Sequence, residues 1–407
     1  MEGSGAPPGK RLLVLGAGPA QLGLLQAARE RGLFVIALDR DPAAPGFRYA
    51  DRRAIISTED ERGIDQLAAA ERVDGVIAPG IDWPVAIAAR VAQRHRLQHP
   101  IDPVAGVLVT SKLRQRERLA EEGVPQPHWK VVNRPDDSLG VPCVVKAPDR
   151  QGQKGLSLVR EAGELRSAVK RALAESRSGV ALIEELVDGP EVTVNAFSAG
   201  GRFQPLTVTD RLTAEPPAFG VALAHAWPSE AAGDEAVRAA EAAAKALGVR
   251  EGPTYTQLRI GRDGPRVIEL AARLGGGHDA ELCRAALGVD LNGLALASAL
   301  GEPVPEHDFR PEPKTGGACV RFLVPPEGEL EAVAGVDEAV AQEGVIGVRV
   351  YREPGHVFGP FRRGADRAGA ILAVGEDRDD ALERADRAGS LIRFQVSGAR
   401  ALAQHGG

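Results

Sequence analysis

One loop combines lysines and glycines in a pattern that could bind an anion. Lys146 ends the apolar run VPCVVK, and the loop APDRQGQKG that follows contains Gly152, Lys154 and Gly155. An ammonium at a strand end can contact phosphate oxygens, while backbone N–H groups beside glycines close over the same anion. The alternative is a hairpin turn whose lysine only extends along the sheet edge into solvent. Taken alone, the pattern leaves both interpretations open.

Acidic side chains follow the next apolar strand, VALIEEL. Glu184 and Glu185 end this strand, and Glu191 comes after a Gly-Pro turn. Backbone groups at such a strand end can pair with the edge of an adenine ring, and Glu191 could accept hydrogen bonds from ribose hydroxyls. A solvated acidic turn explains the local sequence equally well.

A hairpin at 254–273 places two oxygen-bearing side chains opposite each other. With a turn centred on Asp263, Gln257 faces Glu269, at about 5 Å between Cβ atoms. At that separation the two side chains can share a hard cation such as Mg²⁺. Strand alternation puts Arg273 on the same face, about 13 Å further along, where it would contact the far end of an extended ligand. The alternative is an exposed pair of charges formed by Glu269 and Arg273.

The turn at Gly16–Gly23, followed by Asp39 at the end of the next strand, resembles a dinucleotide-binding fingerprint. However, Gln21 stands where that motif has a small residue. We therefore expect a tight turn that faces some ligand other than NAD, and keep an NAD-dependent dehydrogenase as an alternative.

These residues lie on three predicted segments. Residues 10–105 alternate apolar strands with helices at 21–31, 64–71 and 85–94, which predicts a doubly wound parallel sheet. After a charged helix at 112–122, short strands and a helix at 233–247 predict an antiparallel α+β segment. A proline-rich linker near residue 303 leads to strands and a helix at 378–392. The predicted domains are 1–109, 110–302 with a small lobe at about 130–190, and 303–407.

Composition excludes several classes of protein. The 407 residues include 50 Lys and Arg, 56 Asp and Glu and three Cys, with a net charge of −6. Neither sign of charge forms a long run, so we expect no nucleic-acid surface. No run of about 18 apolar residues could cross a membrane, and cysteines without metal-ligand spacing fit a reducing compartment. We therefore expect a cytoplasmic protein whose partners are small molecules.

The order of these motifs resembles the ATP-grasp enzymes over nearly the whole chain. The resemblance rests on KLRQRERLAEEGVPQP, VVKAPDRQGQKGLSLV, IEELVDGPEVTV, TYTQLRI and VIELAARLGGGHDAELCRAALGVDL. Within these enzymes the chain is most similar to the carboxylate–amine ligases that join amino acids. The resemblance implies an ATP-grasp fold: an N-terminal Rossmann-like domain, a central two-lobed domain and a C-terminal α+β domain. It also allows a homodimer.

The resemblance also implies roles for individual residues. The ATP-binding set would comprise phosphate contacts, a loop at 149–155, an adenine hinge at 184–187 and a ribose contact. Its members would be Lys112, Lys146, Gly152, Gln153, Lys154, Gly155, Glu184, Glu185, Val187 and Glu191. Glu269, with Gln257, would hold Mg²⁺ or Mn²⁺, and Arg273 would stabilise an acyl phosphate. The substrate would lie near His225, Arg273, Gly276 and Gly277.

The chain also departs from the family pattern. Gln257 stands where Glu is usual, Ala271 where Asn is usual, and Ser111 replaces an Asp before Lys112. An amide is a weaker Mg²⁺ ligand than a carboxylate and an alanine side chain is none, which favours one metal held by Glu269 and the phosphates.

The expected function is an ATP-dependent ligase that activates a small carboxylate, such as that of an amino acid, as an acyl phosphate and joins it to an amine. One alternative is a purine-pathway ATP-grasp enzyme that carboxylates or uses formate. That enzyme would need a basic cluster for a phosphoribosyl group, and none is evident in the sequence. A nucleotide-binding module without turnover is another alternative, motivated by Gln257 and Ala271.

Overall fold

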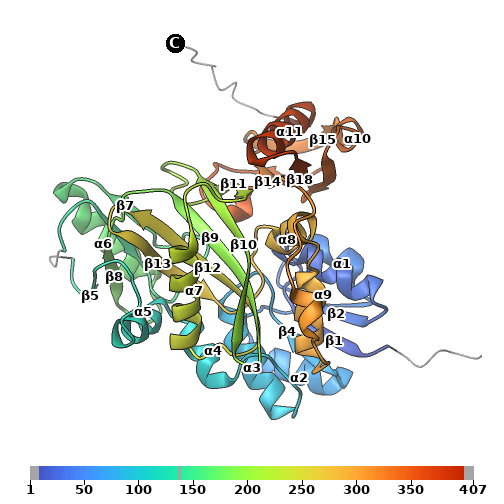
Figure 1. Cartoon of the computed structure of the whole chain (residues 1–407), viewed down its shortest axis with the longest axis horizontal. Coiled ribbons are helices and arrows are strands. Elements are labelled where there is room, and N and C mark those ends of the chain that lie inside the picture. Colours follow the sequence, from blue (N-terminus) through green and yellow to red (C-terminus); the bar gives the residue numbers. More distant parts are fainter. Residues whose placement is uncertain (1–8, 136–138, 398–407) are drawn as a thin grey trace, which may run out of the picture.

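The N-terminal part of the chain forms a parallel sheet in the order β3-β2-β1-β4 (Figure 1). In this computed structural model, which describes residues 9–135 and 139–397, its strands are β1 (Arg11–Leu15), β2 (Phe34–Asp39), β3 (Arg52–Ile55) and β4 (Gly75–Ile77). Leu12 and Val14 of β1 pack into one hydrophobic core, and Leu13 and Leu15 pack into another. Both faces of the sheet are therefore covered, which confirms the predicted doubly wound arrangement.

The helices of this part are close to their predicted positions. They are α1 (Leu22–Glu30), α2 (Glu61–Glu71) and α3 (Trp83–Arg94), each within three residues of prediction. Two further helices, α4 (Pro103–Thr110) and α5 (Lys112–Glu121), lead out of the parallel sheet toward the next part of the chain. Of these, α5 was predicted and α4 was not.

A small lobe follows, with an antiparallel sheet in the order β5-β8-β6-β7. Its elements are β5 (Trp129–Val132), β6 (Cys143–Lys146), β7 (Ser157–Val159), α6 (Ala162–Glu175) and β8 (Ala181–Glu185). Helix α6, which the sequence analysis did not predict, places Leu165, Ala168, Val169 and Ala172 on one buried face. Together with strand residues such as Val145 and Ile183, they form a core of the lobe's own.

The largest sheet has eight strands in the order β13-β12-β9-β10-β11-β14-β18-β16, and all its pairs are antiparallel. The strands are β9 (Glu191–Ala199), β10 (Arg202–Thr213), β11 (Ala222–Trp227), β12 (Gly252–Gly261), β13 (Gly264–Ala271), β14 (Gly317–Leu323), β16 (Val345–Val350) and β18 (Gly369–Gly375). Strands from both sides of residue 303 share this sheet. The domain boundary expected there stays a prediction.

The remaining elements cover or extend this sheet. The helices are α7 (Asp234–Ala246), α8 (Asp279–Leu287), α9 (Leu291–Ala299), α10 (Val336–Val340) and α11 (Arg378–Leu391). A three-stranded sheet, β17-β15-β19, consists of β15 (Gly328–Ala334), β17 (Val357–Phe358) and β19 (Arg393–Ser397). Figure 1 shows the small lobe on one side of the large sheet, the parallel sheet on the other and α11 at the top.

The β12–β13 hairpin pairs Gln257 with Glu269 as predicted, but its turn differs from the prediction and it contains a bulge. Gly261 pairs with Gly264, so the turn is Arg262-Asp263 and is not centred on Asp263. An irregularity then leaves Ile268 as an extra residue, because Leu258 pairs with Val267 and Gln257 with Glu269. The predicted pairing of Gln257 with Glu269 is confirmed, but it depends on this bulge.

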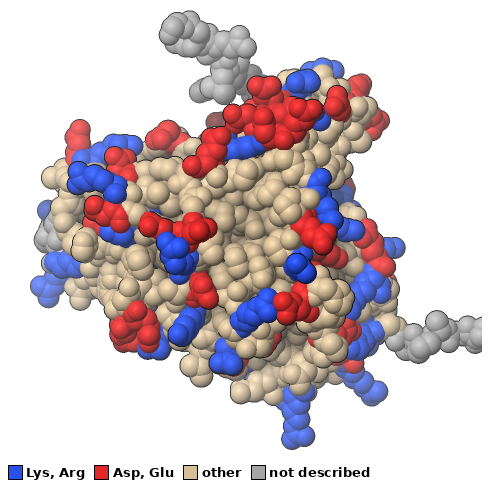
Figure 2. Space-filling view, viewed as in Figure 1, with Lys and Arg blue, Asp and Glu red and all other residues tan. Residues whose placement is uncertain are grey.

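On the face drawn in Figure 2, Lys and Arg side chains are interspersed with Asp and Glu. Among the described residues on this face, no broad basic surface is visible. No helix in the described ranges is both long enough and apolar enough to cross a membrane.

The small lobe should lose stability independently of the parallel sheet. Ile183 is fully buried in the lobe's core, and Ile183→Ala should destabilise the lobe by about 2–5 kcal/mol through lost burial and the cavity left behind. Hydrogen exchange would show faster exchange for amides in β6 and β8 and unchanged protection in β1. Equal loss of protection in both sheets would contradict a separate lobe core.

Candidate functional site

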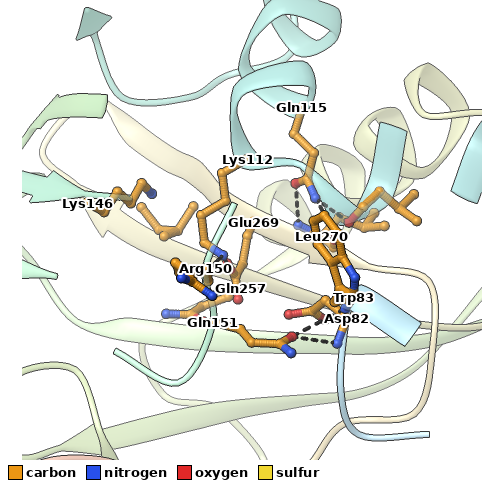
Figure 3. A network of polar contacts seen from close by, with 12 residues as sticks. Asp82, Trp83, Lys112, Gln115, Lys146, Arg150, Gln151, Gln257, Glu269 and Leu270 are labelled. Carbon is orange, nitrogen blue, oxygen red and sulfur yellow. Dashed lines mark hydrogen bonds and ion pairs between the residues drawn. The ribbon is translucent and has the colours of Figure 1, made fainter. Parts of the chain in front are cut away.

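The predicted site residues come from α5, the small lobe, the large sheet and the loop that follows β13. Figure 3 shows Lys112 of α5 and Glu269 of β13 pointing toward one another. Lys112 Nζ lies 3.2 Å from Glu269 Oε2, and it donates a 3.1 Å hydrogen bond to the carbonyl oxygen of Arg150. The structure thus connects α5, the hairpin and the glycine loop at one point.

Neighbouring charges outweigh burial in setting the protonation state of Glu269. Burial raises the pKa of this carboxyl, but Lys112 and Lys146 outweigh burial and lower the pKa to about 2. Conversely, burial works to lower the pKa of Lys112, while Glu269 and Asp82 raise it above the ordinary value. Both groups are therefore charged near neutral pH.

Lys146 belongs to a second, deeper group of charges. Its Nζ lies 2.6 Å from Glu184 Oε2, and Arg116 Nε lies 2.7 Å from Glu184 Oε1. All three side chains are almost fully buried. Burial lowers the pKa of Lys146 to about 8, aided by the charges of Arg116 and Lys112 and opposed by Glu184. The Glu184 side chain thus positions Lys146. Only the backbone groups of Glu184 then remain for an adenine hinge.

The backbone of the predicted hinge is partly engaged already. The N–H of Glu185 donates to the carbonyl oxygen of His128 at 2.9 Å, and that of Leu186 donates to Pro142 at 3.4 Å. Val187 follows as a buried residue. These contacts hold the end of β8 against the segments that flank β5 and β6.

Glu191 meets two side chains from neighbouring strands. Arg211 Nη1 and Gln257 Nε2 both donate to Glu191 Oε1. The side chains of Arg211 and Glu191 are 9% and 7% exposed, so this is a buried ion pair. Nothing in the spacing of the sequence pointed to Arg211, because its contact depends on how β9, β10 and β12 align.

The glycine-rich loop adopts left-handed backbone conformations. Gly152 has φ +66°, Gln153 +62° and Gly155 +71°, while the Lys154 side chain is exposed. Asp149 anchors the start of the loop by accepting hydrogen bonds from the backbone N–H groups of residues 177 and 178. The loop therefore has a defined path, on which Gly152 and Lys154 are exposed.

Glutamines of this loop contact the other two parts of the chain. Gln151 Oε1 accepts hydrogen bonds from the backbone N–H groups of Asp82 and Trp83 at 3.0 and 3.3 Å, as Figure 3 shows. Gln153 Oε1 accepts one from the N–H of Gly364 at 3.4 Å. The sequence analysis predicted neither Gln151 nor Asp82.

Arg273 is held by the same N-terminal loop. Its Nε and Nη2 lie 2.7 and 2.5 Å from Asp82 Oδ1, and Nη1 donates to the carbonyl oxygen of Leu274 at 2.8 Å. A Cβ added at Gly276 would come within 3.0 Å of the carbonyl oxygen of Gly80. The expected need for glycine therefore arises here from close contact with the N-terminal loop.

His225 and Gly277 form a separate corner of the site. His225 is 2% exposed, and burial lowers its pKa to about 4, so the ring is neutral near pH 7. Its Nδ1 lies 3.8 Å from Asp279 Oδ1 and has no hydrogen-bond partner. A Cβ added at Gly277 would lie 2.7 Å from His225 Nε2. Only glycine fits against the ring in this arrangement.

Side chains of the N-terminal part of the chain contact the turn at Gly16–Gly23 or form part of it. Asp39 Oδ2 accepts a hydrogen bond from Ala17 N at 3.0 Å. Gln21 is 1% exposed, and its Nε2 donates to the carbonyl oxygen of Pro79 at 2.7 Å. In this arrangement the acid of the apparent fingerprint already has a partner within the turn.

The donor set fits one Mg²⁺ ion that shares its coordination with phosphate. Within the described residues, no cluster of three or more His, Cys, Asp or Glu side chains could hold a metal ion. Glu269 supplies a carboxylate and Gln257 lies opposite it. Mg²⁺ is commonly bound by one or two carboxylates together with substrate phosphates.

Two protein families match the chain. The ATP-grasp domain family matches residues 139–281, and the L-amino acid ligase C-terminal domain 2 family matches residues 321–397. Together these ranges span more than half of the chain.

Curated relatives cover nearly the whole chain. A formate-dependent phosphoribosylglycinamide formyltransferase of Burkholderia vietnamiensis is 28% identical over 418 residues, covering 95% of this chain and 96% of the relative. An uncharacterized protein of Sinorhizobium fredii is 27% identical over 395 residues, covering 92% and 80% respectively.

Solved structures share the fold. The L-amino acid ligase of Bacillus licheniformis superposes with a TM-score of 0.80 at 20% identity, covering 96% of this chain and 100% of that one. Phosphoribosylglycinamide synthetase of Anaerococcus prevotii gives a TM-score of 0.77 at 20% identity, covering 95% and 100%.

Anion binding should weaken as Lys146 loses its proton. Because the pKa of Lys146 is about 8, affinity for inorganic tripolyphosphate should fall by up to about tenfold per pH unit above pH 8. Calorimetric titration between pH 7 and 9.5 measures this, with Lys146→Met correcting for titration of the ligand itself. The same pH dependence in wild type and Lys146→Met would show that Lys146 does not contact the anion.

Proposed function

We propose that this chain is an ATP-grasp ligase that activates the carboxylate of an amino acid as an acyl phosphate and joins it to an amine. The products are an amide or dipeptide, ADP and phosphate. The observation that carries the proposal is the position of Glu269 among three cations, Lys112, Lys146 and Arg273, which together lower its pKa. The match of residues 321–397 to an L-amino acid ligase domain supports an amino acid as the carboxylate substrate.

The lysines and the loop act on the phosphates. Lys112 and Lys146 neutralise the charge of the β- and γ-phosphoryl groups, while backbone amides near Gly152 and Gly155 cover them. Bound Mg²⁺ would supply further neutralisation of phosphate charge at Glu269. A carboxylate oxygen of the substrate attacks the γ-phosphorus, the bond to the bridging oxygen breaks, and ADP leaves.

Arg273 acts at the acyl end. The amine nitrogen attacks the carbonyl carbon of the acyl phosphate, and negative charge develops on the carbonyl oxygen. The Arg273 guanidinium, positioned by Asp82, donates to that oxygen. The intermediate then expels phosphate, and the nitrogen loses a proton to form the amide. His225 is neutral near pH 7 and lies beside Gly277.

A second candidate is a ligase whose substrate carries a phosphate, and a basic cluster in the C-terminal part favours it. Arg349, Arg352 and Arg367 all act on the pKa of Tyr351, which burial raises. Each has a buried guanidinium nitrogen without a hydrogen-bond partner. Such nitrogens could bind a phosphate, as a phosphoribosyl substrate would require. The sequence analysis had not identified this cluster.

Phosphate release in the presence of ATP and Mg²⁺ separates these functions. We expect release that depends on a pair of amino acids, in a panel that also contains glycinamide ribonucleotide with formate or bicarbonate. Release only with the ribonucleotide would replace the first candidate by the second. ATP binding with no release for any pair would indicate a module without turnover.

Glu269→Gln should reduce turnover by about 100-fold or more, because the amide removes the charge that opposes the three cations and binds Mg²⁺ weakly. Steady-state release of phosphate measures this loss. Glu241→Gln, at an exposed position of α7, serves as the matched control and should retain full activity. An active Glu269→Gln variant would remove Glu269 from the proposed metal site.

A further inference from the structure

The site has few oxygen donors for metal ions. Gln257 Nε2 donates to Glu191 Oε1, and the remaining amide oxygen of Gln257 is a neutral donor, weaker for Mg²⁺ than a carboxylate. Ala271, the next residue after Glu269 on the same face, carries no donor and is 2% exposed. Glu269 is thus the carboxylate that remains for an ion at this point. A second ion would need a further carboxylate, which neither Gln257 nor Ala271 provides.

Arg211 brings a permanent positive charge to the same place. Its guanidinium meets the same Glu191 oxygen as the amide of Gln257. Arg211 and Glu191 line one cavity of about 420 Å³. Arg211 Nε is buried and has no hydrogen-bond partner. A buried guanidinium with a donor to spare, in hydrogen-bond contact with the carboxylate that also holds Gln257, points to an anionic ligand.

We propose that the site binds a single divalent cation, at Glu269, and that Arg211 supplies the second positive charge that faces the ATP phosphates. The inference rests on the proposed function only in that the chain binds ATP with a metal ion. A guanidinium has five donors in a planar arrangement, so it can keep Glu191 and still contact a phosphate oxygen. Its charge also repels a second cation from the position beside Gln257.

Counting metal ions tests the first part. With a non-hydrolysable ATP analogue, titration with Mn²⁺ followed by electron paramagnetic resonance should give one bound ion per chain. The count should stay at one in Gln257→Glu, where Arg211 still excludes a second ion, and rise to two in Arg211→Met/Gln257→Glu. Two bound ions in wild type or in Gln257→Glu would overturn the proposal. One bound ion in the double variant would also overturn it.

Affinity for nucleotides tests the second part. Arg211→Met should weaken binding of the ATP analogue by about tenfold to a hundredfold, the effect of losing a charged hydrogen bond, and leave AMP binding unchanged. Equal loss for AMP would mean that Arg211 acts on the nucleoside through Glu191, and would overturn the assignment. Arg384→Met is a matched control, because it removes another largely buried arginine, paired with Asp380 and outside the lining of the cavity that Arg211 lines, and should alter neither affinity.

The two proposals fail in distinguishable ways. If wild type binds no ATP analogue, the ligase function fails and this inference with it. If wild type binds the analogue with two ions, the inference of a single cation fails, and if Arg211→Met keeps full affinity, the assignment of Arg211 fails. Neither result contradicts the ligase function. Thermal unfolding of each variant confirms that it is folded before its binding is compared.

Discussion

The outer edge of β13, which α5 covers, is the constraint on which the site depends. This strand ends the eight-stranded sheet, and unpaired backbone groups at such an edge need partners. Side chains of α5 supply them: Gln115 pairs with both the N–H and the carbonyl oxygen of Leu270, and Arg116 donates to the carbonyl oxygens of Val267 and Ile268. The helix therefore holds the bulge that places Glu269 opposite Gln257.

Arg116 also connects β13 to the small lobe. The same guanidinium that binds the bulge also contacts Glu184, and Glu184 contacts Lys146. Removing one member of a buried ion pair leaves an unpaired charge and costs about 3–5 kcal/mol. The lobe carrying Lys146 and the strand carrying Glu269 thus share one chain of buried charges. The two ends of the expected phosphate site cannot shift independently without breaking it.

The sequence predicted residues whose partners are near in the chain and missed those whose partners come from another part. Gln257 and Glu269 belong to one hairpin, so their pairing could be worked out, although the turn and the bulge that produce it could not. Lys112 and Arg116 are four residues apart on one helix face, a spacing that could have drawn attention to Arg116. Arg211 and Asp82 gave no such signal, because their contacts exist only after distant strands and loops meet.

Contacts of the glycine loop explain why the three parts of the chain must be considered as one site. Gln151 binds backbone N–H groups at the start of α3, and Gln153 binds the N–H of Gly364. The N-terminal residue that meets Gln151, Asp82, also holds Arg273. The loop that is proposed to cover the phosphates is therefore linked through Asp82 to the group proposed to act at the acyl carbon. The loop contacts the backbone N–H of Asp82 and Arg273 contacts its carboxylate, so under the proposed function we expect binding at the phosphate end and positioning of Arg273 to be energetically coupled.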